Sequence, residues 1–419
     1  MSQEFENCNT AMNRRSFVKK SLMTSAAAGL VTSLSGASGQ SGEIKDEGGK
    51  DRKIKIGLIG CGGRGQWLIP LFQEHGGFEL HGVADYFAEA ANGAGEKFGV
   101  DKSRRFSGLS GYKRLLESGI EAVLIEDVPY FYPEQATDAV EAGMHVYMAK
   151  PIAVDVPGCL MIQAAGQKAT RNKSCFLVDY QLPTQEPMVE IAKRVQEGAL
   201  GSLAHIASFG MAWQAWPDPP LTANVESRLR KQIWLSDTGL SGDTIVSYDI
   251  HIIDALMMLV GKRPVGAYGS AKKLRANPHG DRTDTVSVIY ECEQGATWTH
   301  ITQALNNNFD ITSLSASVFG MSATAHIGYG GKVYIRGSEK HYVKTIGSLY
   351  NDGVKCNIAD FYRNITQGNY ENATVQRAVD GTLTAILGRE AAGRRCYLSM
   401  DDLIKENKKL EVSLEGMKA

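Results

Sequence analysis

The sequence predicts an α/β protein in which a doubly wound parallel sheet precedes a second, α+β domain with a large, mostly antiparallel open sheet. Between residues 54 and about 180, short apolar segments alternate with amphipathic helical segments, as in a parallel sheet with crossover helices. After about residue 200, the segments become longer and alternate between apolar and polar residues, which favours an antiparallel sheet. A glycine-rich turn directly after the first apolar segment is the third observation.

Short apolar segments mark the predicted strands, and longer periodic segments mark the helices. In the first domain, strands are expected near residues 54–60, 79–84, 121–126, 144–148 and 174–179. In the second domain, strands are expected near 203–210, 264–273, 284–292 and 296–304, with one helix near 244–260. Helical periodicity returns over 357–366 and 374–393, where Gly393 fits a C-cap position, and we expect these helices to pack near the domain junction.

The first apolar segment runs directly into Gly60-Cys61-Gly62-Gly63-Arg64-Gly65, which has the spacing Gly-x-Gly-x-x-Gly. Gly60 permits a tight strand-to-helix turn, Gly62 lets phosphates approach the backbone, and Gly65 lets helix and strand pack closely. An apolar helical segment follows, whose N-terminus would supply free N–H groups and a positive dipole. These features predict a Rossmann dinucleotide-binding domain, with Gly63 and Arg64 also at the cofactor.

Asp85 ends the next apolar segment about 20 residues further on, at the position of the acid that binds ribose hydroxyls. A 2′-phosphate at this position would meet a like charge, and the residues that follow, Tyr86-Phe87-Ala88, include no Arg or Lys. The sequence therefore favours NAD over NADP as the cofactor.

The composition excludes several classes of function. The 419 residues are 43% hydrophobic and 22% charged, with a formal net charge of −1, which is typical of a globular protein with a substantial core. The near-neutral charge lacks the basic excess that nucleic-acid binding needs, and no apolar run reaches the roughly 18 residues of a transmembrane helix. The seven cysteines form no Cys-x-x-Cys pair, so we expect mostly buried thiols and no metal site.

The N-terminus resembles a twin-arginine export signal, because Arg14-Arg15-Ser16-Phe17 precedes a mildly apolar run and then small residues. This predicts a signal peptide over 1–38, a linker over 39–52, a dinucleotide-binding domain over 53–180 and a substrate and oligomerisation domain over 181–419. Such a signal predicts an exported, periplasmic protein that can carry a cofactor loaded in the cytoplasm. A disordered basic tail is the alternative.

Two further segments match a known family. One runs from Glu141-Ala142-Gly143 through His145-Val146 to Lys150-Pro151, and the other runs from Gly242 through His251 to Asp254. Together with the glycine loop and Asp85, they resemble the glucose-fructose oxidoreductase / inositol dehydrogenase (Gfo/Idh/MocA) family over most of residues 54–400. The resemblance implies a nicotinamide dinucleotide in the first domain and a sugar or cyclitol substrate in a cleft against the open sheet.

Lys150 and His251 are the predicted catalytic residues. By resemblance, Lys150 and Pro151 lie beside the nicotinamide ribose and the substrate hydroxyl, where a partly desolvated lysine could move the hydroxyl proton. On one continuous helix, Ser247, His251 and Asp254 would share a face, so that Asp254 could orient His251 as an acid or base. A surface lysine and a structural histidine are the alternatives.

The chain departs from the family pattern on the substrate side. Ala149 stands where members usually carry Glu before Lys-Pro, and Ser247 stands where they usually carry an acid four residues before the histidine. Asp249 could replace that acid only if the helix starts late, and residues 126–132 also differ from the family pattern. We therefore expect a rebuilt substrate site.

Other candidates for the substrate site follow from position alone. Tyr180 and Gln181 end the strand that leads into the second domain, so they could line the cleft. Trp213 begins an aromatic segment whose rings could stack on a sugar, cover the core of the second domain or form a subunit interface. An open sheet with an exposed face also predicts a homo-oligomer formed through that sheet.

Three hypotheses about function follow. The leading one is an NAD-dependent oxidoreductase that acts on a carbohydrate or cyclitol hydroxyl or ketone. The second, also implied by the resemblance, is a glycosidase with a retained NAD that oxidises a sugar transiently, cleaves by elimination and then reduces the product. The third, motivated by Ala149, Ser247 and the altered 126–132 loop, is a sugar- or dinucleotide-binding protein without catalysis.

Overall fold

The structure is a computed structural model that describes residues 52–212, 224–275, 280–293, 295–305, 307, 314–337, 341–347 and 349–419. The signal peptide predicted over 1–38, nearly all of the linker over 39–52, and Trp213 lie outside these residues, so those expectations stay predictions. In the described part of the chain, no helix is both long enough and apolar enough to cross a membrane.

The first domain is built on a parallel sheet, as the alternating pattern predicts. Among the described residues this sheet has six strands in the order β3-β2-β1-β4-β5-β6, and every neighbouring pair is parallel. The strands are β1 (Ile54–Ile59), β2 (Phe78–Asp85), β3 (Arg105–Ser107), β4 (Ala122–Ile125), β5 (His145–Met148) and β6 (Phe176–Val178). The order reverses between β1 and β4, and ligands of such sheets bind beyond the carboxyl ends of the strands at this point.

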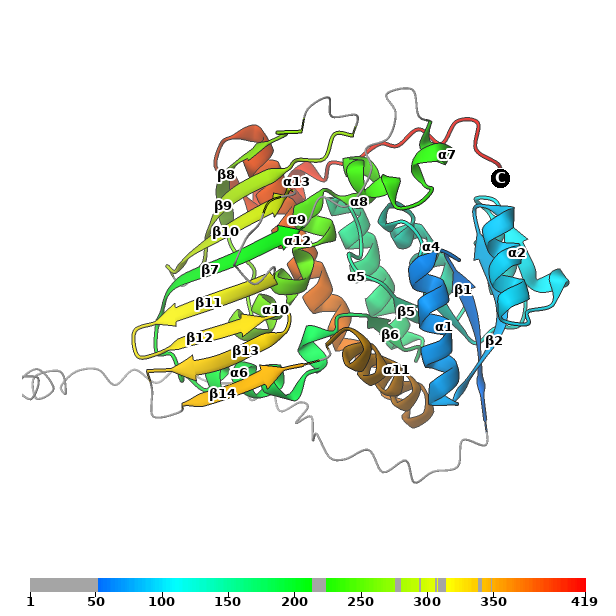
Figure 1. Ribbon diagram of the computed structural model, residues 1–419, viewed down its shortest axis with the longest axis horizontal. Coiled ribbons are helices and arrows are strands. Elements are labelled where there is room, and N and C mark those ends of the chain that lie inside the picture. The colour runs from blue at the N-terminus through cyan, green and yellow to red at the C-terminus, as the bar shows by residue number, and fades with distance from the viewer. Residues whose placement is uncertain are drawn as a thin grey trace, which may run out of the picture. The chain divides into compact units, whose positions relative to one another are not determined.

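Two apolar cores cover the two faces of this sheet. Along β4, Leu124 belongs to one core together with Phe72, whereas Val123 and Ile125 belong to the other. This two-sided burial explains why the strand sequences are continuous apolar runs. The helices between the strands are α1 (Gly63–His75), α2 (Ala88–Lys97), α3 (Gly111–Leu116), α4 (Tyr132–Glu141) and α5 (Val156–Arg171) (Figure 1).

The second domain is built on a larger, mostly antiparallel sheet, which confirms the predicted fold class. Among the described residues it has nine strands in the order β14-β13-β12-β11-β7-β10-β9-β8-β15, and only β7 and β10 pair in parallel. The strands are β7 (Leu203–Ala212), β8 (Gly266–Lys272), β9 (Thr285–Glu291), β10 (Thr297–Ala304), β11 (Leu314–Gly320), β12 (Thr324–Gly328), β13 (Gly331–Arg336), β14 (Tyr342–Ile346) and β15 (Leu398–Ser399).

The sequence pattern predicts no strand at β3, at β15 or from β11 to β14. β3 has three half-buried residues and β15 has two residues, so neither is long enough to show a period. The strands from β11 to β14 are five to seven residues long and carry glycine, serine and charged residues, which weakens their apolar alternation.

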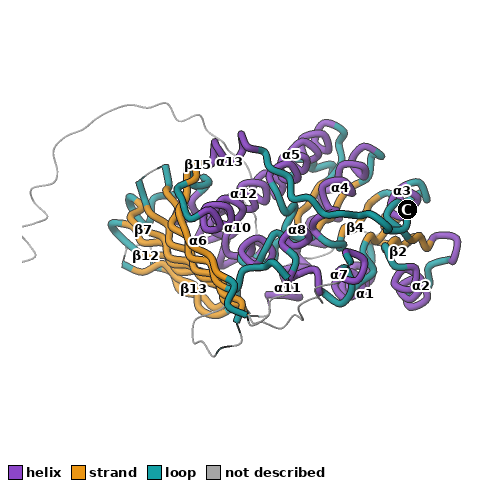
Figure 2. The backbone as a smooth tube through the Cα atoms, turned by 90° about the horizontal axis from the view of Figure 1, so that it is seen from above, coloured by secondary structure: helices purple, strands orange, loops and turns teal. Residues whose placement is uncertain are grey.

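Helices cover one face of the large sheet (Figure 2). Those against it are α6 (Glu186–Gln196), α10 (Ile250–Val260) and α12 (Ala373–Arg394). Along β9, Val286, Val288 and Tyr290 are buried on the helix side, while Ser287 and Ile289 are exposed on the other. The remaining α-helices of the described chain are α7 (Val225–Arg228), α8 (Thr238–Ser241), α9 (Thr244–Ser247), α11 (Leu349–Gln367) and α13 (Met400–Glu406).

The single helix predicted over 244–260 is wrong. α9 ends at Ser247 and α10 begins at Ile250. Between them, the Asp249 carboxylate turns into the large sheet, where it accepts a hydrogen bond from His300 at 2.9 Å and another from Thr302. These two hydrogen bonds from β10 fix Asp249 between the two helices, where the chain is not helical.

The C-cap predicted at Gly393 is also wrong. α12 continues through Arg394, and Arg395 takes the left-handed conformation with a φ of 54°. Ion pairs from Arg394 to Glu390 at 3.2 Å and to Glu406 at 2.6 Å hold the last turn of α12 against α13. The helix predicted over 357–366 exists, but it is the second half of the longer α11.

Candidate dinucleotide and substrate site

The glycine loop turns tightly between β1 and α1. Gly60 has a φ of +90°, and a Cβ there would lie 2.5 Å from the Glu126 carbonyl carbon. A Cβ on Gly65 would lie 2.1 Å from the Gly60 carbonyl oxygen. Neither position can take a larger residue unless the backbone moves.

Gly62 and Gly63 leave the start of α1 open. A Cβ on either residue would meet no described atom within 4 Å, and no side chain caps the helix. The first N–H groups of α1 and the positive end of its dipole therefore border a cavity of about 680 Å³, which both glycines line. A pyrophosphate fits this cradle, because it is an anion that accepts hydrogen bonds from N–H groups.

Asp85 lies at the end of β2 and borders the same cavity. Its carboxylate accepts hydrogen bonds from the backbone N–H groups of Cys61 and Phe87, each at 2.8 Å. Burial and the nearby Asp127 carboxylate raise the pKa of Asp85 to about 6, so the group is still mostly ionised at pH 7. The two neighbouring acids suit the hydroxyls of a ribose and disfavour a 2′-phosphate.

Residues 229–232 and Trp234 form another wall of this cavity, although they belong to the second domain. Arg230 pairs with Glu89 of α2 at 2.6 Å, and its guanidinium carbon lies 3.8 Å from the centre of the Phe87 ring. The cleft for a dinucleotide is thus bordered by both domains.

A second cavity, of about 420 Å³, adjoins the first, and Arg64 and Glu126 border both. Lys150, Pro151 and His251 line the second cavity, so the structure brings the two predicted catalytic residues together. Aromatic side chains complete its wall, namely Tyr132, Trp234, Tyr248 and Tyr350.

Lys150 lies soon after β5, and its Nζ donates a hydrogen bond to the Ser247 carbonyl oxygen at 2.8 Å. Burial and the Arg64 charge lower the pKa of Lys150 to about 7, although carboxylates partly oppose this, namely those of Asp179, Glu126 and Asp249. Near neutral pH this amine can therefore take up or release a proton. The Ser247 carbonyl fixes the position of the nitrogen that carries that proton.

His251 lies in the first turn of α10 and borders the same cavity. Burial, reinforced by the charges of Lys150 and Arg64, lowers the pKa of His251 well below its usual value, so the imidazole is neutral at pH 7. Its ring centre lies 4.7 Å from that of Tyr329 and 6.5 Å from that of Tyr180. A neutral imidazole can donate one hydrogen bond and accept another, as contact with a hydroxyl requires.

The contact expected between Asp254 and His251 is not formed. Asp254 faces α12, where its carboxylate accepts a hydrogen bond from Arg377 at 2.8 Å. Asp249 is turned into the large sheet, and neither carboxylate borders the substrate cavity. Asp254 pairs with Arg377, and Asp249 accepts hydrogen bonds from β10, so neither carboxylate is available to His251.

Tyr180 and Gln181 support the cavity rather than line it. Tyr180 is buried with its ring edge-on to His251. Gln181 is also buried, accepts a hydrogen bond from the Tyr329 hydroxyl at 2.6 Å and donates one to Asp179 at 3.1 Å. Tyr180 therefore contacts the His251 ring directly. Gln181 binds the hydroxyl of Tyr329, whose ring in turn lies against His251.

A buried ion-pair cluster around Arg64 is not predicted from the sequence. The Arg64 guanidinium pairs with Glu126 at 2.9 Å and with Asp179, and it donates a hydrogen bond to the Tyr350 hydroxyl at 3.0 Å. Burial raises the pKa of Glu126 to about 7, against the opposing charge of Arg64. Both acids directly follow buried strands, β4 and β6, and this position at the edge of a parallel sheet is the signal that could have identified them.

The fold and these cavities define a dinucleotide-binding α/β protein with a second domain on the substrate side. Residues 54–180 match the family model described as "Oxidoreductase family, NAD-binding Rossmann fold", and residues 188–338 match "GFO/IDH/MocA C-terminal domain". The chain therefore belongs to the Gfo/Idh/MocA oxidoreductase family, and its cofactor is NAD.

Solved structures share this fold. Levoglucosan dehydrogenase in complex with NADH and levoglucosan is 18% identical, with a TM-score of 0.66, and the match covers 83% of this chain and 100% of that one. Aldose-aldose oxidoreductase from Caulobacter crescentus, complexed with glycerol, gives the same four values.

Curated relatives match over shorter stretches. Glycosyl hydrolase family 109 protein 2 of Shewanella sp. (strain ANA-3) is 24% identical over 210 residues, which are 47% of this chain and 45% of the relative. Inositol 2-dehydrogenase of Burkholderia cenocepacia (strain HI2424) is 27% identical over 150 residues, or 36% of this chain and 43% of the relative. The chain thus spans less than half the length of these relatives.

Substitutions in the glycine loop should separate cofactor binding from folding. Gly62→Ala is expected to fold normally, because its Cβ meets open space, yet to weaken NAD binding by more than about tenfold by filling the phosphate cradle. Gly65→Ala is the contrasting variant, since its Cβ collides with the backbone and should lower the melting temperature. Calorimetric titration and thermal unfolding check both, and full NAD affinity in Gly62→Ala would contradict the assignment.

Proposed function

We propose that this protein is an NAD-dependent oxidoreductase that interconverts a hydroxyl and a carbonyl group on a carbohydrate or cyclitol. The observation that carries the proposal is the second cavity, which Lys150 and His251 border and which adjoins the dinucleotide cleft at Arg64 and Glu126. The names of similar proteins, which include inositol 2-dehydrogenase and levoglucosan dehydrogenase, support a polyhydroxylated substrate.

The residues of this cavity can carry the proton chemistry of such a reaction. A bound nicotinamide supplies the hydride acceptor or donor. In the oxidation direction, the neutral Lys150 amine removes the hydroxyl proton and becomes an ammonium ion, and in reduction it returns that proton. His251, which is neutral at pH 7, holds a substrate hydroxyl by hydrogen bonding. Tyr248 and Tyr350 offer aromatic faces to the C–H surface of a sugar.

A glycosidase with a retained cofactor is the alternative, which the relatives named glycosyl hydrolase family 109 proteins favour. In this reaction a ring hydroxyl is oxidised, a proton next to the new carbonyl is removed, and the glycosidic oxygen leaves. Water then adds to the double bond, and the carbonyl is reduced again, so that no net oxidation occurs. The same pair, Lys150 and His251, could handle the protons.

Turnover measurements separate these reactions. With NAD and a panel of sugars, cyclitols and aryl glycosides, an oxidoreductase forms one reduced nicotinamide per substrate, whereas a glycosidase releases the aglycone without a lasting change in nicotinamide absorbance. Lys150→Met and His251→Ala are expected to lower kcat at least about a hundredfold while NAD still binds. Full activity in Lys150→Met would contradict its role in proton transfer. A wild type that binds NAD without any turnover would favour the non-catalytic hypothesis.

The rate of oxidation should follow the ionisation of Lys150. Because only the neutral amine accepts a proton, kcat/KM is expected to fall as the pH drops below about 7 and to level off above it. Ionised Glu126 favours the ammonium form, so Glu126→Gln should lower the pKa of Lys150 and move this fall to lower pH by about one unit.

Asp127→Asn is the matched control for this pH profile, because the Asp127 charge acts on Asp85 rather than on Lys150. The control should keep the wild-type profile in the pH range of Lys150. An identical profile in Glu126→Gln would show that Glu126 has only a structural role.

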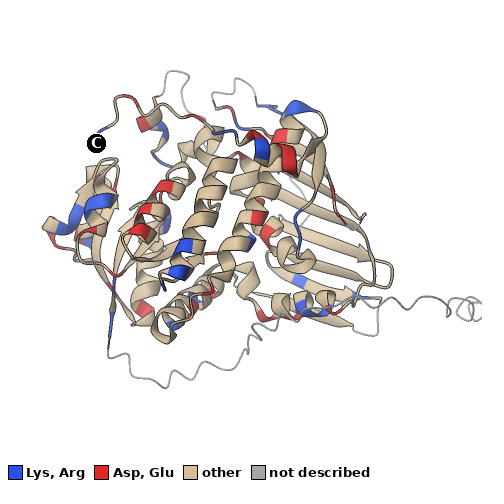
Figure 3. Ribbon diagram, turned by 180° about the vertical axis from the view of Figure 1, so that it is seen from behind, with Lys and Arg blue, Asp and Glu red and all other residues tan. Residues whose placement is uncertain are grey.

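We also propose that the exposed face of the large sheet forms a homo-oligomer. Tyr268 and Ile289 are partners across β8 and β9, each 52% exposed, and Figure 3 shows few charged residues along the strands of this sheet. Exposed apolar faces of this kind are typical of subunit contacts. Ile289→Glu is expected to reduce the mass in solution to that of one chain, measured by light scattering. A wild type that is already monomeric would refute the proposal.

A further inference from the structure

The last residues of the chain return from the second domain to the first. After α13 ends at Glu406, residues 408–419, here called the C-terminal segment, reach the loop after β3 beside the carboxyl end of β2 (Figure 1). On the way, Val412 packs close to Gly239 of α8. The segment therefore runs past α8 to the loop that follows β3, which lies next to Tyr86 and Asp85.

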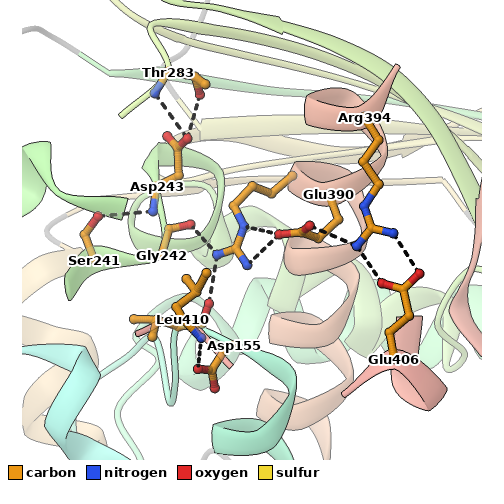
Figure 4. A network of polar contacts seen from close by, with 11 residues as sticks. Asp155, Ser241, Gly242, Asp243, Thr283, Glu390, Arg394, Glu406 and Leu410 are labelled. Atoms are coloured by element: carbon orange, nitrogen blue, oxygen red, sulfur yellow. Dashed lines mark hydrogen bonds and ion pairs between the residues drawn. The ribbon is translucent and has the colours of Figure 1, made fainter. Parts of the chain in front are cut away.

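The start of the C-terminal segment is anchored to the first domain. The Leu410 N–H donates a hydrogen bond to the Asp155 carboxylate at 2.9 Å (Figure 4). The other oxygen of that carboxylate accepts a hydrogen bond from the Gly158 N–H and so caps α5. The same view shows the ion pairs of Arg394 with Glu390 and Glu406, which join α12 to α13 just before the segment begins.

The far end of the segment packs on the loop after β3. The Leu109 N–H donates to the Lys418 carbonyl oxygen at 3.0 Å, and the Lys418 N–H donates to the Tyr86 hydroxyl at 3.2 Å. Gly108 has a φ of +87°, and a Cβ there would lie 2.2 Å from the Ala419 carbonyl oxygen. Glycine at this position is what allows the segment to lie against the loop.

Between these anchors, Leu414 borders a third cavity, of about 190 Å³, next to Asp85. The other walls are largely apolar and aromatic, and they include Ile59, Tyr112 and Phe131. Asp85 borders both this cavity and the dinucleotide cleft. If Asp85 binds a ribose, the base attached to that ribose can therefore reach the third cavity.

Gln135 lines the third cavity and has one side-chain atom without a hydrogen-bond partner among the described residues. Gln135 is buried, and its amide nitrogen donates to the Asp127 carboxylate at 2.7 Å. Its Oε1 atom has no hydrogen-bond partner among the described residues, and a buried acceptor without a donor costs free energy. Adenine has a flat, largely apolar ring, so it matches the apolar and aromatic walls of this cavity.

We propose that the C-terminal segment completes the adenine end of the NAD site through Leu414 and slows the release of the cofactor. This inference rests on the proposed NAD-dependent function. Residues 229–232 border the cleft beside the glycine loop, and the C-terminal segment borders the cavity beyond Asp85. A bound dinucleotide is held between them, and the segment has to lift from the loop after β3 before the adenine can leave.

Leu414→Ala in the full chain tests the contact with adenine. Val412→Ala is the matched control, because Val412 lines a different cavity. With AMP and nicotinamide mononucleotide as probes in calorimetric titrations, Leu414→Ala is expected to weaken AMP binding about tenfold and to leave the mononucleotide unchanged. Val412→Ala should change neither. Equal AMP affinity in all three proteins would overturn the inference, and so would an equal loss for both probes, because it would indicate general loosening.

A chain that ends at Asn407 tests the effect on release. Dissociation of NAD, followed by stopped flow after mixing with a competitor, is expected to be at least about tenfold faster than from the full chain. An unchanged rate would overturn the inference, and if the shortened chain does not fold, Leu414→Ala decides. Both measurements report binding alone, so a lack of sugar turnover would count only against the proposed function. A wild type that does not bind NAD would overturn both.

Discussion

The junction between the dinucleotide cleft and the substrate cavity depends on the charge of Arg64. Its guanidinium lies between two buried carboxylates, Glu126 and Asp179, and extends to the Tyr350 hydroxyl. Without Arg64 these buried acids would lose the cation with which they pair, which is far more costly than the loss of an exposed ion pair. Because Arg64 also lies in the first turn of α1, the same residue fixes the glycine loop relative to the wall of the substrate cavity.

Burial brings two proton-carrying groups near Arg64 into one range of pH. Burial and Arg64 lower the pKa of Lys150 to about 7, and burial raises the pKa of Glu126 to about 7. Groups that interact in this way share macroscopic ionisations. The ionisation of Glu126 therefore changes the proton affinity of Lys150. In water, the ordinary pKa values of a lysine and a carboxylate lie far apart.

What the sequence could predict depends on local spacing. The glycine loop, Asp85 and Lys150 belong to motifs of fixed length, and the structure places them around adjoining cavities. The partner of Asp254 could not be predicted, because Arg377 comes from a helix more than a hundred residues later in the chain. The break in the substrate-side helix has the same origin, since donors on β10 hold it open. Local patterns thus define the cofactor side, whereas long-range polar contacts define the substrate side.

The pairing of β4 and β5 explains the departure from the family pattern at Ala149. The Ala149 N–H donates a hydrogen bond to the carbonyl oxygen of Ile125, the residue directly before Glu126, at 3.0 Å. Glu126 and Ala149 therefore follow neighbouring parallel strands, and both border the substrate cavity. A carboxylate at position 149 as well would bring two like charges together in a buried site. Glu126, directly after the adjacent strand, is thus a carboxylate that raises the pKa of Lys150 from this edge of the sheet, and it also pairs with Arg64 of α1.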